Sequence, residues 1–110
     1  MEYLVTVAFD LHDAETDDYQ RMYRELAGLG LSSSLVGVQG NRATLPATTV
    51  CGLFTGPDSS GVRAHVVRGC EDAFSRQGLS GKLLVVVGND WAWDVRSVAP
   101  SLLRSYGSVG

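Results

Sequence analysis

The strongest strand signal in this sequence is the run Tyr3-Leu-Val-Thr-Val-Ala-Phe-Asp10-Leu-His12. Its apolar residues are nearly continuous, which is typical of a strand that lies inside a sheet. Side chains two positions apart on a strand share a face, so Asp10 and His12 are expected to project together where the strand ends. The run therefore predicts a strand from Tyr3 to Phe9 and, at its end, a candidate site.

Apolar periodicity divides the rest of the chain into two helices and several short strands. Stripes with spacings of three and four predict a helix from about Asp17 to Leu29, with Thr16 as its N-cap, and a second helix from about Gly61 to Gln77. Glycine, proline and polar residues mark the turns between these segments. The other predicted strands are Ser34 to Val38, Thr49 to Phe54 and Lys82 to Val87.

The resulting order is strand, helix, strand, strand, helix, strand, which is the split β-α-β pattern of ferredoxin-like domains. Right-handed crossovers would place both helices on one face of a four-stranded antiparallel sheet and leave the opposite face without cover. We therefore expect an α+β, ferredoxin-like domain over residues 1–94 and a C-terminal tail over residues 95–110 that could pack on a partner subunit. A homodimer is expected, formed through sheet faces or by exchange of tails.

Composition limits the function classes that fit. The chain has 110 residues, 45% of them hydrophobic, which is enough for one domain with a real core. Its formal net charge of −3 argues against tight nucleic-acid binding by a monomer, because such proteins are usually basic. Cys51 and Cys70 lack zinc-type spacing, so buried free thiols are the simpler interpretation, although spacing alone leaves a disulfide open. Without an apolar run of membrane-spanning length or a basic leader, a cytoplasmic protein is expected.

Over about residues 3 to 90 the chain resembles a group of small ferredoxin-like nucleases. The matching features are Phe9-Asp10-Leu11 at the end of the first strand, Leu29-Gly30-Leu31 at the end of the first helix, and Ser32-Ser-Ser34 at the start of the next strand. This layout is similar to that of the CRISPR-associated Cas-two proteins, the VapD toxin ribonucleases and the GhoS antitoxin ribonuclease, with GhoS nearest in outline. The resemblance implies a homodimeric, metal-dependent endoribonuclease or RNA-binding protein. In such dimers the two copies of Asp10 would face each other across the two-fold axis and hold Mg²⁺ or Mn²⁺.

Asp10 and His12 are accordingly the candidate catalytic residues, and Asp10 is the candidate metal ligand. Magnesium prefers oxygen ligands, and a bound ion could activate water and neutralise charge on a phosphodiester. The simpler role for Asp10 is to accept hydrogen bonds from backbone amides in the following loop. His12 could act as a general base or be an ordinary exposed loop histidine.

Other features are open to more than one interpretation. Arginines on both predicted helices could contact a nucleic-acid backbone, or simply occupy the solvent-facing sides of amphipathic helices. Trp91 and Trp93 alternate at strand spacing and could stack bases, anchor a dimer interface or pack under the tail. The alternatives to a ribonuclease are a non-catalytic dimeric scaffold, an antitoxin that works by protein contact, and a small-ligand regulatory domain.

Overall fold

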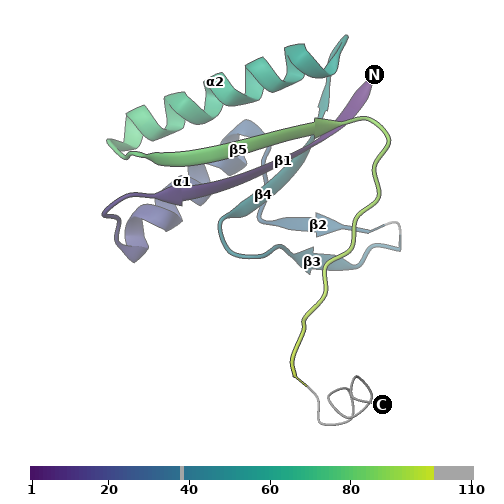
Figure 1. Ribbon diagram of the computed structural model, residues 1–110, viewed down its shortest axis with the longest axis horizontal. Helices are drawn as coiled ribbons and strands as arrows, with labels where there is room; N and C mark the ends of the chain where they lie inside the picture. Colours follow the sequence, from purple (N-terminus) through teal and green to yellow (C-terminus); the bar gives the residue numbers. More distant parts are fainter. Residues whose placement is uncertain (38, 101–110) are drawn as a thin grey trace.

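The computed structural model describes residues 1–37 and 39–100, which form an α+β arrangement of helices and antiparallel strands (Figure 1). The elements are β1 (Glu2–Leu11), α1 (Thr16–Leu29), β2 (Ser34–Val36), β3 (Arg42–Thr44), β4 (Thr49–Thr55), α2 (Ser59–Gln77) and β5 (Gly81–Gly88). The α+β class, both helices and the three main strands are confirmed. Val38, the expected end of the second strand, and residues 101–110 of the tail lie outside the described residues.

Strand β1 is the middle strand of a three-stranded sheet with the order β4-β1-β5. Both pairings are antiparallel, and Val7 lies opposite Val50 on one side and Val85 on the other. A strand with neighbours on both edges suits β-branched and aromatic residues, which explains the nearly continuous apolar run in this part of the sequence. The buried side chains of β1 alternate along it and are Tyr3, Val5, Val7, Phe9 and Leu11.

The expected four-stranded sheet is wrong, because the segment after α1 leaves the main sheet. Ser32 forms an antiparallel bridge with Cys51 of β4 through two backbone hydrogen bonds of 2.7 and 2.9 Å. Strand β2 then pairs with β3 as a separate two-stranded sheet. Their connection passes through Gly40 at a φ of 85°, a conformation that favours glycine. Pairing across this short turn closes a much smaller loop than pairing with β4 would, so the local hairpin forms.

Both helices pack on the face of the main sheet that holds the buried side chains of β1. Phe9 contacts Tyr19 and Tyr23 of α1, with ring centroids 6.5 and 5.7 Å apart. One hydrophobic cluster joins this face of β1 to buried residues of both helices: Met22 and Leu26 of α1, and Val62, Val66, Cys70, Ala73 and Phe74 of α2. This cluster therefore lies between the helices and one face of the sheet.

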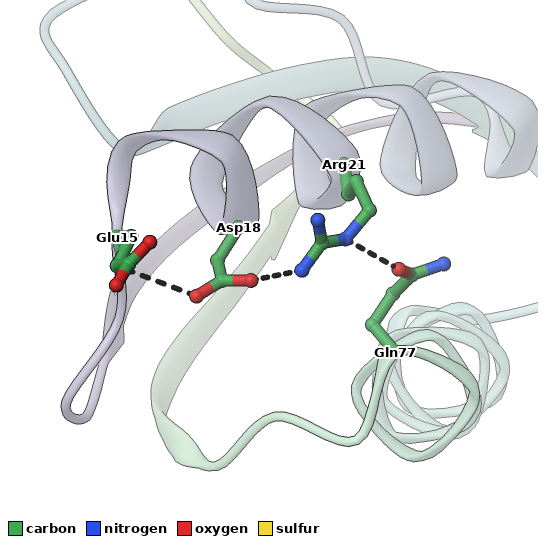
Figure 2. Close-up of polar contacts among 4 residues, drawn as sticks. All are labelled: Glu15, Asp18, Arg21 and Gln77. Carbon is green, nitrogen blue, oxygen red and sulfur yellow. Dashed lines mark hydrogen bonds and ion pairs between the residues drawn. The ribbon is translucent and has the colours of Figure 1, made fainter.

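Local polar contacts define the ends of the helices and connect them. The N-cap of α1 is Glu15, one residue before the expected Thr16, because the backbone N–H of Glu15 donates to Asp18 Oδ2 at 2.9 Å. Figure 2 shows how Asp18 also pairs with Arg21, whose Nε donates to Gln77 Oε1 at 3.0 Å. This chain of contacts joins the first turns of α1 to the last turn of α2.

Two glycines allow backbone segments to approach more closely than a side chain would permit. A Cβ atom on Gly52 of β4 would lie 2.0 Å from the carbonyl oxygen of Gly30, just after α1. A Cβ atom on Gly81 of β5 would lie 1.8 Å from the carbonyl oxygen of Asp10. The sheet is thus held tightly both against the end of α1 and at the end of β1.

Candidate functional site

The face of the main sheet opposite the helices has a largely apolar surface. Register places Leu4 opposite Leu53, and Ala8 opposite Leu84, on this side of the sheet. We call this surface the open face; by register it comprises Leu4, Thr6, Ala8 and Asp10 of β1, Thr49, Cys51 and Leu53 of β4, and Lys82, Leu84 and Val86 of β5. Leu53, Leu84 and Val86 are 55%, 61% and 53% exposed. This is the face that the predicted topology leaves uncovered.

Asp10 lies at one end of the open face. Its side chain is exposed, and Lys82 is its cross-strand neighbour on β5. With Ala8, Thr48 and Lys82 it lines an open pocket of about 300 Å³. The expected position of Asp10 at the end of a sheet strand is therefore confirmed, but the neighbouring lysine was not foreseen.

His12 lies just beyond the last residue of β1. Its backbone N–H donates to the carbonyl oxygen of Ser80 at 2.9 Å, which extends the β1–β5 ladder by one step. The imidazole is exposed, and Asp13 follows with a φ of 48°. Both side chains belong to the described part of the chain, and no hydrogen bond connects Asp10 to His12 there. The role of His12 in proton transfer therefore stays a prediction.

A metal site at Asp10 does not fit one copy of the chain. Within residues 1–37 and 39–100, no three His, Cys, Asp or Glu side chains gather closely enough to hold a metal ion. Asp10 would supply a single carboxylate, and the positive charge of Lys82 across the ladder opposes a bound cation. Apart from water, further carboxylate ligands would have to come from outside the described residues, for example from a second copy of the chain.

Two arginines that could have bound a nucleic-acid backbone instead contact other residues of the domain. Arg21 contacts Asp18 and Gln77, and Arg76 Nε lies 2.7 Å from Glu25 Oε1, linking α2 to α1. The hydrogen bond from Arg76 lowers the pKa of the Glu25 carboxyl group, and the same contact raises the pKa of Arg76. These arginines therefore act at least in part as helix-to-helix contacts.

Both cysteines are buried, free thiols, as the simpler interpretation of the sequence predicted. Cys51 Sγ lies 3.4 Å from Thr6 Oγ1. Burial raises the pKa of the Cys70 thiol to about 11. Neither thiol is exposed, as the thiol of a reactive cysteine is.

The described part of the tail, residues 89–100, leaves the end of β5 and runs past the β2–β3 hairpin (Figure 1). These residues belong to no strand pairing. Trp91 and Trp93 are 36% and 38% exposed, and they line a groove of about 810 Å³ with Val36, Asn41 and Ala43 of the hairpin region. The tail is thus an extended segment that carries two large, incompletely buried aromatic side chains.

Lys82 and Thr48 are the parts of the Asp10 pocket that sequence reasoning missed. Their closeness to Asp10 depends on strand register, for which the sequence contains no local signal. No described helix combines the length and hydropathy that a membrane crossing requires. No protein-family model matches this sequence, and no curated protein matches it.

Proposed function

We propose that this chain is a non-catalytic interaction module that works as a homodimer, in the manner of a scaffold or of an antitoxin that acts by protein contact. One observation carries this proposal: the apolar open face, on which Leu53, Leu84 and Val86 are each more than half exposed. Contiguous apolar surface of this kind marks protein contact sites in soluble proteins. Buried free thiols are compatible with the cytoplasm as its location.

The strand order is compatible with a ferredoxin-like topology, which would support this proposal. Ser32 bridges to the edge of β4 that faces away from β1, so the segment after α1 begins where a fourth strand would lie. With β5-β1-β4 as the order of the other strands, the connections follow the split β-α-β pattern. In that arrangement both helices cover one face, and the other is available for association.

The energetic gain from covering the open face is large enough to matter. Fully burying a leucine or valine side chain contributes about 1.5–3 kcal/mol. About half of the surface of Leu53, Leu84 and Val86 is still exposed, so covering it would contribute about 1 kcal/mol for each side chain. In a symmetric pair both copies would make this contribution, which doubles the total.

Charge on the open face favours protein over nucleic acid as its partner. Lys82 is its single cation and is the cross-strand neighbour of Asp10, while the centre of the face is uncharged. Nucleic-acid surfaces need clustered positive charge. An apolar centre with one charged pair at its end instead resembles a protein interface, with its apolar core and polar rim.

Sedimentation equilibrium of the purified chain, beside Leu84→Asp, tests the proposal. The native protein is expected to be a dimer at micromolar concentration and the variant a folded monomer, because a buried carboxylate without a partner is costly. Ala64→Asp places the same charge on the exposed side of α2 and is expected to leave the dimer intact. A native protein that remains monomeric, or equal behaviour of the two variants, would overturn the proposal.

A second candidate function is the metal-dependent endoribonuclease implied by the family resemblance, with RNA as substrate and Mg²⁺ or Mn²⁺ as cofactor. It is favoured by the position of Asp10 on the open face itself, since some face-to-face pairings would bring two copies of Asp10 together. RNA cleavage should be assayed with Mg²⁺, with Mn²⁺ and with chelator for the native chain, Asp10→Ala and His12→Ala, with Asp13→Ala as a matched control. Metal-dependent cleavage that is lost in a folded, dimeric Asp10→Ala but kept in Asp13→Ala would establish this function over the first. Absent or equal cleavage in all four proteins would reject it.

A further inference from the structure

We propose that in the dimer the tail of each copy, residues 89–100, lies across the open face of the other copy and seats Trp91 and Trp93 on it. The occupant of the open face is thus a second copy of this chain, and its tail is the part that makes the contact. This inference rests on the proposed homodimer, and it adds the segment that completes the interface.

The open face is too small to form a stable interface through contact with the open face of a second copy alone. Three strands spaced about 4.8 Å apart, over the seven residues from Leu4 to Asp10, give a footprint of about 300 Å². A stable interface buries about 800 Å² on each partner. Two tryptophans would supply part of the difference: a whole tryptophan buries about 150–250 Å², and the exposed 36% and 38% of Trp91 and Trp93 amount to about 110–185 Å² together.

The tail has the features required of such a covering segment. Its backbone enters no strand pairing, and both tryptophans keep more than a third of their surface exposed. Extended chain covers about 3.3 Å per residue, so residues 89–100 can reach about 40 Å, roughly twice the length of the open face. Trp91 and Trp93 share one side of an extended chain, so both can meet the same surface.

The start of the tail directs it away from the open face of its own chain. Gly88 pairs with Leu4 at the end of the sheet, and the side chain of Asn89 donates to Met1 Sδ at 3.2 Å. From there the tail runs past the hairpin rather than back along β5, and Leu84 and Val86 keep more than half of their surface. To cover its own face the chain would have to reverse sharply beside this contact, whereas the face of a second copy requires no reversal.

A mixing experiment separates a tail that acts on the partner from one that acts on its own chain. The first variant, Leu84→Asp, has a defective open face and an intact tail. The double variant, Trp91→Ser with Trp93→Ser, has an intact open face and a defective tail. For each variant alone, the dissociation constant of the homodimer is expected to be at least about 30-fold higher than for the native chain, since buried aromatic anchors dominate interface energies. An equimolar mixture is expected to form heterodimers, because the intact tail of the first variant meets the intact face of the second.

Native mass spectrometry of differently tagged variants reads out the heterodimer, and far-UV circular dichroism checks that each variant is folded. Val86→Lys replaces Leu84→Asp if the latter does not fold. A native monomer would overturn the proposed function together with this inference. A native dimer that survives loss of both tryptophans overturns this inference alone. Two monomeric variants that stay monomeric when mixed also overturn it, because the tail would then act within its own chain.

Discussion

Replacing Gly52 by alanine should lower the free energy of unfolding by about 2–3 kcal/mol, the upper part of the range for overpacking a tight site. The new Cβ atom would lie 2.0 Å from the carbonyl oxygen of Gly30 and 3.1 Å from the ring of Phe54. Because carbon and oxygen rarely approach within about 3.3 Å, the two backbones would have to separate by more than about 1 Å.

Neither backbone can move by this amount without losing other contacts. Gly30 caps α1 in the left-handed conformation, at a φ of 104°, and its N–H donates to Ala27 O at 3.0 Å. Strand β4 is held by β1 along one edge and by the Ser32 bridge on the other. Neither backbone can therefore shift to relieve the clash without breaking other contacts. For this reason we expect the loss in free energy of unfolding to lie near the top of the range for overpacking.

Urea unfolding followed by circular dichroism, at one fixed protein concentration, measures this loss. For a domain of this size it corresponds to a fall in melting temperature of roughly 8–20 °C. Gly28→Ala is the matched control, because its Cβ would meet no atom within 4 Å and it lies inside α1. There alanine should be neutral or stabilise by up to about 1 kcal/mol. If Gly52→Ala changes stability by less than about 0.5 kcal/mol, a level typical of surface substitutions, the close approach of β4 to the end of α1 is wrong.

Three further predictions concern single side chains. Asp58→Ala should lower the free energy of unfolding by about 1 kcal/mol, measured by urea titration, because its carboxylate accepts from Gly61 N at 2.7 Å as the N-cap of α2. Burial raises the pKa of Cys70 from 9.0 to about 11, so its contribution to the free energy of unfolding should be fully present below pH 9 and be lost as pH rises toward 11. A Cys70→Ala protein whose stability shows the same decline would contradict this. Because the contact with Arg76 lowers the pKa of the Glu25 carboxyl, its contribution should be present above the ordinary pKa of 4.5 and be lost as pH falls through the lowered value; Glu25→Gln should remove this part of the acid dependence.

Local patterns were sufficient for most of the fold. Strand β1, both helices and strands β4 and β5 were predicted because each has a periodicity that extends over at least six residues. The position of Asp10 at a strand end follows from the same local pattern. The N-cap of α1 was misplaced by one residue, because Glu15 uses its backbone N–H with Asp18 and Thr16 offered the more usual side chain.

The errors came where distant segments compete. Three-residue strands contain too little pattern to show whether β2 pairs with β4 or with the nearby β3. The Asp10 pocket was incomplete for a similar reason, since Lys82 faces Asp10 only through a register set by the whole length of β1 and β5. The uncovered sheet face was foreseen from topology, but its apolar character depended on which side of β5 carries Leu84 and Val86.

The middle position of β1 has a consequence for synthesis on the ribosome. Its two neighbours in the sheet, β4 and β5, are both made later, and about seventy residues separate Leu11 from Gly81. At about 5–20 residues per second, β1 waits roughly 4–14 s for its second neighbour. Throughout that interval a strongly apolar strand has an unpaired edge, which is the kind of surface that chaperones protect. Slow codons placed before β5 should therefore increase aggregation of the newly made chain more than slow codons placed after it.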